Sequence, residues 1–276
     1  MLKVGIRAHD VTSSNIFDLA LKVEQKGFKY IQFVLKKALK EDDGLLSNDK
    51  ALHFKKVLNE HNIEVAMLGA YFNPVHSNKD KVKEAVDKFK NHLEYASLIG
   101  TKYVGSETGS YNDDKWTYNV KNHTEEAYQE VFKVFNELKE TAEDFNVNVN
   151  IEGAYHHCMG TPQMLNRLVR ELNSDNVTVI VDLYNYLYIG NHEQRNKIFE
   201  DAINLMKDKI VLFHLKDYIV DGDKLKQVGL GQGLMDYPFM IKLIKTHCPN
   251  AFLIFEGVTG DDIDSSLEYI NRLLNE

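Results

Sequence analysis

The chain has 276 residues, of which 43% are hydrophobic and 27% are charged. These proportions exclude a disordered or low-complexity chain and allow a sizeable hydrophobic core. Lysine and arginine together number 33 against 41 acidic residues, which gives a formal net charge of −8. A protein that holds nucleic acid through charge needs the opposite balance, so we expect no nucleic-acid partner.

The expected cellular compartment is inferred from the number of cysteines and from the length of the apolar segments. Two cysteines, Cys158 and Cys248, are too few for a disulfide framework in a chain of this length. The first residues, MLKVGIRAHDVTSS, lack the apolar run of a secretion signal. No window approaches the roughly 20 apolar residues of a membrane helix. We therefore expect a cytoplasmic protein with no membrane partner.

Short apolar runs of strand type alternate along the chain with longer stretches of helical period. The predicted strands cover residues 2–8, 30–35, 63–70, 102–105, 147–152, 177–182, 210–214 and 252–256. The predicted helices cover residues 16–26, 51–61, 80–98, 125–145, 164–172, 194–206, 238–247 and 263–274. Eight such pairs leave roughly 34 residues for each strand, helix and two loops, a comfortable length for one unit.

Strands that alternate with helices are parallel and joined by crossover helices. Eight repeats predict a closed (β/α)8 TIM barrel that forms one α/β domain over residues 1–276. The competing architecture is an open doubly wound sheet. Neither a G-x-G-x-x-G turn after a strand nor a G-x-x-x-x-G-K-[ST] loop occurs in the sequence, which argues against that alternative.

Four predicted strands end on a residue that can ligate a metal: Glu152, Asp182, His214 and Glu256. In a barrel the active site lies at the carboxyl ends of the strands, where consecutive strand ends converge. A single carboxylate there is more often a helix cap or a solvated loop residue. Three carboxylates crowded together repel one another and lose solvation, and a cation offsets that cost.

One histidine and three carboxylates form a hard set of nitrogen and oxygen ligands. We expect this set to bind one divalent ion, with Mn²⁺ as the first choice. Mg²⁺ and Co²⁺ suit the same ligands, and Zn²⁺ is a further alternative.

The series at the ends of strands five to eight resembles the xylose isomerase-like TIM barrels. That superfamily contains sugar and sugar-phosphate isomerases and epimerases, with inosose dehydratase and endonuclease IV relatives. Two more segments carry the resemblance, the His-x-Lys-Asp sequence at residues 214–217 and the Gly-x-Gly-x-Gly sequence at 229–233 followed by Asp-Tyr-Pro at 236–238. The similarity covers essentially the whole chain and is more specific for the superfamily than for one activity.

The resemblance implies that Glu152, Asp182, His214 and Glu256 hold one metal and that the substrate is a small sugar or sugar derivative. It also implies a role for the two glutamates as an acid/base pair. They would move a proton beside a sugar carbonyl through a metal-stabilised enediolate, which gives epimerisation or isomerisation. The alternatives are an inosose-type dehydratase on the same metal site and a non-catalytic barrel that retains the metal.

Departures from the sequence patterns of two groups in the superfamily narrow the range of expected activities. Endonuclease IV relatives carry a second histidine three residues after the strand-six aspartate, where this chain has Asn185. The triplet at 223–225, Asp-Lys-Leu, also lacks their next histidine, so DNA repair is disfavoured. Ketose 3-epimerases usually have histidine at the position of Asn185 and arginine at that of Val220. Asn185 remains available to bind a substrate hydroxyl.

Several residues near the strand ends are candidates for binding substrate. Lys216 shares a face with His214 and could hold a substrate oxygen or phosphate, or form an ion pair with Asp217 or Glu256. His157 is preferred over His156 as the histidine that faces the site. No phosphate cradle is visible, so a phosphorylated substrate is neither supported nor excluded.

Three further candidates lie on other loops. Glu107 ends the fourth strand and could orient a substrate hydroxyl or Glu152, or simply cap a loop. Trp116, the single tryptophan, lies in a polar loop where an indole suggests a cover over sugar carbons. His9 ends the first strand and could bind substrate, although a lone histidine there is more often structural. A homo-oligomer is possible, and no sequence feature locates an interface.

Overall fold

The structure is a computed structural model and describes residues 2–276. Eight parallel strands close into a barrel, so the predicted (β/α)8 fold is confirmed. Around the barrel the strands follow the order β1-β10-β7-β6-β5-β4-β3-β2. Their bounds are β1 (Lys3–Arg7), β2 (Tyr30–Phe33), β3 (Glu64–Gly69), β4 (Tyr103–Glu107), β5 (Asn148–Glu152), β6 (Val177–Asp182), β7 (Ile210–Leu215) and β10 (Phe252–Phe255).

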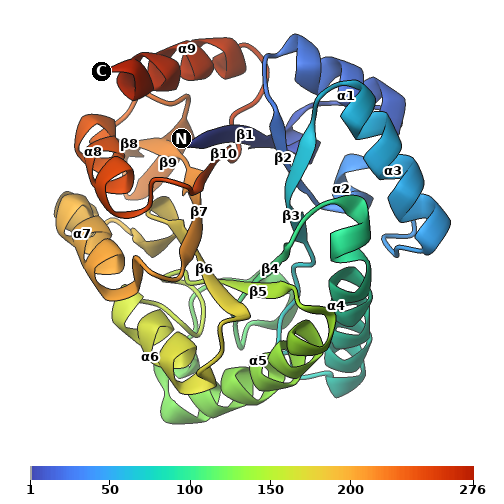
Figure 1. Cartoon of the computed structure of the whole chain (residues 1–276). Coiled ribbons are helices and arrows are strands. Elements are labelled where there is room, and N and C mark those ends of the chain that lie inside the picture. The colour runs from blue at the N-terminus through green and yellow to red at the C-terminus, as the bar shows by residue number, and fades with distance from the viewer. Residues whose placement is uncertain (1) are drawn as a thin grey trace.

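The helices form a ring outside the barrel, as Figure 1 shows in a view along the barrel axis. Their bounds are α1 (Ile16–Gln25), α2 (Leu35–Ala38), α3 (Asn48–Glu60), α4 (Lys79–Ile99), α5 (Glu125–Phe145), α6 (Pro162–Leu172), α7 (Arg195–Met206), α8 (Tyr237–His247) and α9 (Asp262–Asn275). Local sequence fixes several helix starts, because Asn15, Asn78 and Thr124 each accept a hydrogen bond from the first turn.

Most strand bounds lie within one residue of the predicted ones, two strands differ by two residues at their carboxyl ends, and the structure adds the short helix α2 and one hairpin. The run at 30–35 stops at Phe33, because the short helix α2 begins at Leu35. The fourth strand extends to Glu107 instead of ending at residue 105. After β7 the chain forms an antiparallel hairpin of β8 (Asp217–Asp221) and β9 (Lys224–Val228), which the sequence analysis did not predict. Its turn contains Gly222 with φ 63°, a conformation that glycine adopts readily.

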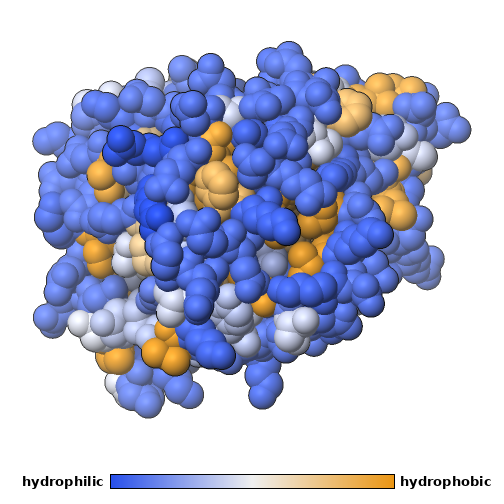
Figure 2. Space-filling model, turned by 90° about the horizontal axis from the view of Figure 1, so that it is seen from below, coloured by the Kyte–Doolittle hydropathy of each residue, from blue (hydrophilic) through white to orange (hydrophobic). Residues whose placement is uncertain are grey.

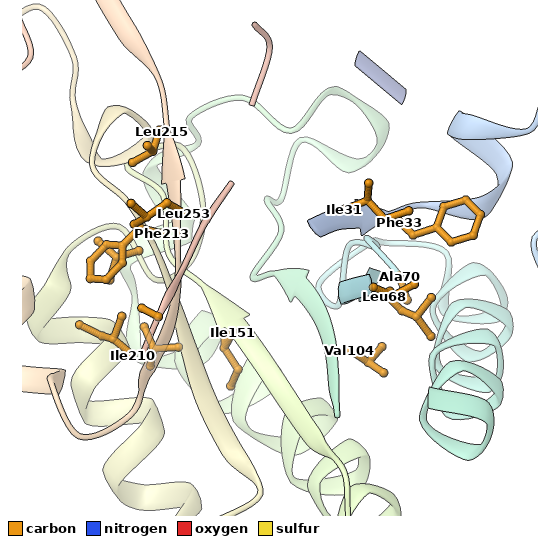
Figure 3. Close-up of a cluster of buried hydrophobic side chains, with 14 of the residues drawn as sticks. Ile31, Phe33, Leu68, Ala70, Val104, Ile151, Ile210, Phe213, Leu215 and Leu253 are labelled. Atoms are coloured by element: carbon orange, nitrogen blue, oxygen red, sulfur yellow. The ribbon is translucent and has the colours of Figure 1, made fainter. Parts of the chain in front are cut away.

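Two sets of side chains alternate along each barrel strand. Those pointing outward pack against the helices, and Figure 3 shows Phe33, Leu68 and Val104 on the strand side that faces a helix. Those pointing inward include Met67, Ile180 and further apolar residues that fill the lower barrel. The barrel interior is therefore a packed core, and the functional groups are confined to its carboxyl end.

The face of the molecule drawn in Figure 2 is largely hydrophilic. Figure 2 shows one flank of the molecule on which apolar side chains form only small scattered patches. Among residues 2–276, no helix is long and apolar enough to cross a bilayer.

Candidate metal centre

The period of two along each strand brings the four predicted ligands into the barrel interior. Ile180 on β6, Leu212 on β7 and Ile254 on β10 are all interior residues. Asp182, His214 and Glu256 each follow one of these residues by two positions, so they point inward as the next layer. Glu152 follows the buried Asn150 on β5 in the same way.

The same layer contains polar side chains from other strands. Parallel register places Arg7 of β1 opposite Gln32 of β2, and Glu107 of β4 opposite Glu152 of β5. Asp182 lies opposite His214. The top of the barrel is therefore a ring of polar groups above an apolar floor.

The four predicted ligands converge on one point. One ligand atom from each of Glu152, Asp182, His214 and Glu256 lies within 4.8 Å of all the others. The Nδ1 atom of His214 is 3.4 Å from a Glu152 oxygen, 3.8 Å from Asp182 and 2.9 Å from Glu256. The side chains of His214 and Asp182 are fully buried, and that of Glu152 is only 1% exposed.

A buried amide orients the histidine. The Nε2–H of His214 donates to Oε1 of Gln32 at 2.6 Å, and Nε2 of Gln32 donates to the Tyr71 hydroxyl at 2.7 Å. Nδ1 is then the ring nitrogen that faces the three carboxylates. Histidines that bind metals commonly donate their other ring N–H in this way.

The carboxylates of the cluster favour a positive charge at its centre. Nδ1 of His214 has no hydrogen-bond partner of good geometry within residues 2–276, although acidic oxygens surround it. Burial alone would lower the pKa of His214, but the charges of Glu256 and Glu152 raise it to about 10. Burial also raises the pKa of Asp182, to about 6, despite the nearby Lys216. A divalent cation would satisfy the same oxygens and the Nδ1 lone pair, so the residues fit a metal.

Lys216 lies at the edge of the cluster. Its ammonium group is 2.8 Å from an Asp182 oxygen and 2.7 Å from a Glu256 oxygen, and it donates to Asn185 Oδ1 at 3.0 Å. Burial would lower the pKa of Lys216, but these carboxylates raise it above its ordinary value. Asn185 in turn donates to Glu152 at 2.8 Å, so both predicted residues contact the ligand set.

Arg7 is a site residue that the sequence analysis missed. Its guanidinium contacts Glu256 Oε1 at 2.8 Å and forms two hydrogen bonds to Asp10. The same Glu256 oxygen also faces Lys216. Burial would raise the pKa of Glu256, but Lys216 and His214 hold it well below its usual range. A signal existed, because Arg7 ends an apolar strand as the four predicted ligands do.

Glu107, His157 and Trp116 gather on one side of the ligands. A Glu107 oxygen lies 3.9 Å from Nδ1 of His157, and the His157 ring meets the Trp116 indole edge to face at 5.4 Å. Burial and the charge of Glu152 raise the pKa of Glu107 well above its usual value. Burial lowers the pKa of His157 to about 4. His156, by contrast, is exposed.

An open cavity of about 340 Å³ lies directly above the carboxylates. Glu152 and Glu256 line it together with Arg7, His9 and Trp116. The volume lies near the lower end of the range of about 300–1,000 Å³ that is typical of small-molecule sites. Burial lowers the pKa of His9 to about 4, so this side chain is a neutral wall of the cavity at pH 7.

Asp217 points away from the ligands and holds the glycine-rich loop. Its carboxylate accepts hydrogen bonds from the backbone N–H groups of Gly231, Gly233 and Met235 at 2.9–3.0 Å, and from Tyr218. A Cβ atom at Gly233 would lie 2.3 Å from an Asp217 oxygen. Within the His-x-Lys-Asp segment, Lys216 therefore faces the site, whereas Asp217 holds the glycine-rich loop.

Comparisons with known proteins agree with this architecture. The family described as Xylose isomerase-like TIM barrel matches residues 20–273. An inosose isomerase of Bacillus velezensis is 24% identical over 235 residues, which cover 80% of this chain and 76% of the relative.

Solved structures superpose over almost the whole chain. A D-tagatose 3-epimerase-like protein has a TM-score of 0.79 at 18% identity, with coverage of 99% of this chain and 97% of the other. The IOLI protein, solved with a bound zinc atom, has a TM-score of 0.74 at 20% identity, with coverage of 99% and 96%. At these identities the likeness shows a common fold. The match of the family over 254 residues, from 20 to 273, shows more: this chain belongs to the xylose isomerase-like TIM barrel family.

Proposed function

We propose that the protein is a divalent-metal-dependent isomerase or epimerase of a small sugar or sugar derivative. The observation that carries the proposal is the convergence of Glu152, Asp182, His214 and Glu256 within 4.8 Å beneath an open cavity. Similarity to an inosose isomerase and to an epimerase-like structure supports the same reaction class. Mn²⁺ is the first choice for the ion, because oxygen ligands dominate the set.

The bound ion would act as a Lewis acid on the substrate carbonyl and make the neighbouring C–H more acidic. Glu152 and Glu256 line the cavity and are the groups placed to remove and return that proton. Return to the same carbon from the opposite face is epimerisation, and return to the adjacent carbon is isomerisation. Lys216 and Asn185 would orient substrate oxygens from the other side of the ligands.

A dehydratase on the same ligands is a second candidate. Lys216 favours it, because a buried ammonium group can donate a proton to a departing hydroxyl. The two carboxylates beside Lys216 hold it in the charged form, so the proton-abstracting base would be a glutamate. A dehydratase generates an unsaturated or diketo product that absorbs in the ultraviolet, whereas an isomerase does not.

The experiment measures metal content and proton transfer together. The Mn²⁺-loaded protein is incubated with a panel of aldoses, ketoses and inososes in D₂O, and NMR follows deuterium incorporation beside the carbonyl. We expect deuterium exchange or a new sugar isomer with at least one compound. Glu152→Gln and Glu256→Gln should each lower the rate about 10²–10⁴-fold.

A matched control is Glu64→Gln, because Glu64 lies at the opposite end of the barrel, at the start of β3. Mass spectrometry should find about one Mn²⁺ per chain in the wild type and the control, and Asp182→Ala should lose it. If both glutamine variants keep full turnover with metal bound, the acid/base assignment is wrong. If the wild type binds neither Mn²⁺ nor Zn²⁺, the proposed metal-dependent function is refuted.

A further inference from the structure

A second, larger cavity adjoins the one above the ligands. It has a volume of about 480 Å³ and is lined by residues after β5, after β6 and on the β8–β9 hairpin. Glu107 and Trp116 line both cavities, so these two side chains stand at their junction. Asn185, which donates to Glu152, also lines the second cavity. We call the second space the outer cavity.

The lining of the outer cavity is mainly aromatic and aliphatic. Tyr184 and Tyr188 contribute rings, and Ile189 and Leu225 contribute aliphatic side chains. The Tyr188 ring stacks on Tyr155 with centroids 4.0 Å apart, which fixes its orientation. Ile189 is 42% exposed, so part of this apolar lining is accessible from solvent.

The charges around the outer cavity do not suit an anion. Its carboxyl and amino groups are those of Asp223 and Lys224, whose opposite charges offset each other, and of Glu107, whose pKa is raised well above its usual value by burial. A phosphate site needs an excess of positive charge, with arginine, lysine or several backbone N–H groups turned toward it. An uncharged ring with one apolar face suits this lining better.

The Trp116 loop is held in place before any ligand arrives. Trp116 adopts φ 51°, a left-handed conformation that is rare for a bulky residue and is retained only where surrounding contacts require it. Asn73 donates to the carbonyls of Ser110 and Asp113, and Asn122 donates to the carbonyl of His156. These bonds fix both flanks of the loop, so the indole stands between the two cavities as part of a preformed site.

We propose that the outer cavity is a subsite for a second, uncharged ring that is attached to the sugar above the ligands. The substrate class would then be a two-ring sugar whose second ring is joined through a hydroxyl oxygen, so that the carbonyl of the reacting unit stays free. The inference rests on the proposed function, because it takes the cavity above the carboxylates as the place of the reacting sugar. Trp116 would contact both rings, with Ile189 and Tyr188 contacting only the second.

The test compares ligands that differ only in the second ring. Trp116 is the only tryptophan, so intrinsic fluorescence of the Mn²⁺-loaded protein reports binding in either cavity, and calorimetry checks it. The probes are D-glucose and D-xylose, the disaccharides cellobiose, maltose and xylobiose, whose reducing-end unit keeps a free carbonyl, and glucose 6-phosphate. We expect at least one disaccharide to bind about tenfold more tightly than its monosaccharide.

Two variants and a matched control locate the effect. Ile189→Ala and Tyr188→Ala should each weaken disaccharide binding about fivefold and leave monosaccharide binding unchanged. Val220→Ala is the control, because Val220 is also 42% exposed but lies on the hairpin away from the cavity lining. It should change neither affinity.

Three results would overturn the subsite. One is equal affinity for monosaccharides and disaccharides, and another is no saturable binding of any probe by fluorescence and calorimetry. The third is tighter binding of glucose 6-phosphate that Lys224→Gln abolishes, which would mark an anion site. Disaccharide binding without deuterium exchange on any probe would refute the proposed reaction and retain the subsite. Exchange on monosaccharides with no preference for disaccharides would refute the subsite alone.

Discussion

The contact between Gln32 and His214 gives a sharp prediction about metal affinity. Gln32 is fully buried, and its side-chain oxygen accepts from His214 Nε2–H at 2.6 Å. The substitution Gln32→Leu preserves much of the volume but removes the acceptor. Removing such a partner of a metal-bound histidine lowers metal affinity by about 10–100-fold. We therefore expect Mn²⁺ binding to weaken by about 1.4–2.7 kcal/mol.

The stability of the metal-free protein should fall as well. Gln32→Leu leaves the His214 N–H without a partner in a buried place, which costs about 1–3 kcal/mol of unfolding free energy. Urea denaturation of the metal-free protein measures this effect separately from metal affinity. The comparison matters because a variant that is only less stable would bind Mn²⁺ normally once folded.

The assay is competition between the protein and a chelator of known affinity at fixed pH. Gln32→Glu is the first control, because it keeps an oxygen acceptor for the His214 N–H. Tyr71→Phe is the second, because it removes only the hydroxyl that receives the Gln32 N–H and should have a smaller effect. If Gln32→Leu binds Mn²⁺ within about twofold of the wild type, the reasoning about His214 orientation is refuted.

Three other predictions use different parts of the chain. Because the pKa of His214 is raised to about 10, Mn²⁺ binding at pH 7.5 should release about one proton. Calorimetry in buffers of different ionisation enthalpy measures the number of protons released, and a value of zero would contradict the prediction. Asp217→Asn should lower the free energy of unfolding by about 2–4 kcal/mol, because one amide oxygen cannot replace a carboxylate that accepts four backbone N–H groups. An unchanged urea midpoint would contradict this prediction. Burial lowers the pKa of His92 in α4 to about 4, so the unfolded chain binds the proton more tightly than the folded chain does. The contribution of His92 to the free energy of unfolding should therefore be full above pH 6.5. It should fall by up to about 3 kcal/mol as the pH is lowered toward 4. His92→Gln should flatten this decline in urea titrations, and an unchanged pH dependence would exclude His92 as its source.

The barrel and the clustering of Glu152, Asp182, His214 and Glu256 were predictable for a shared reason. Parallel strands buried on both faces are continuous apolar runs, and a polar residue at the end of such a run is conspicuous. Asp182 after VTVIV and His214 after IVLF stand out in this way. Since strand ends converge in a closed barrel, the sequence separation of these residues did not obscure their proximity.

The supporting contacts were harder to predict, because they depend on register and side-chain reach. Gln32 lies inside the run YIQFVL, where the period of two already places it on the same face as Tyr30. Its partner His214 is 182 residues away, and no local pattern joins the two. The hairpin had a signal in Asp-Gly-Asp between alternating segments. It was missed because Lys224–Val228 mixes polar with apolar residues and contains no fully buried residue, unlike a barrel strand.

The surroundings of the two glutamates differ in a way that bears on the proposed reaction. Glu256 contacts the two cations Arg7 and Lys216 through one oxygen, whereas Glu152 receives a hydrogen bond from the neutral amide of Asn185. A carboxylate held by two cations is a weaker base than one held by an amide. Within the proposed reaction, we therefore expect Glu152 and not Glu256 to remove the proton.

This asymmetry can be tested through Arg7. Arg7→Met removes one cation from Glu256 and leaves every contact of Glu152 unchanged. If Glu256 takes part only as a ligand, deuterium exchange in the variant should stay close to the wild-type rate once Mn²⁺ is bound. If Glu256 is the base, its basicity rises in Arg7→Met and the pH dependence of exchange shifts upward. A shifted profile would thus assign the proton-removing role to Glu256 and contradict the preference for Glu152.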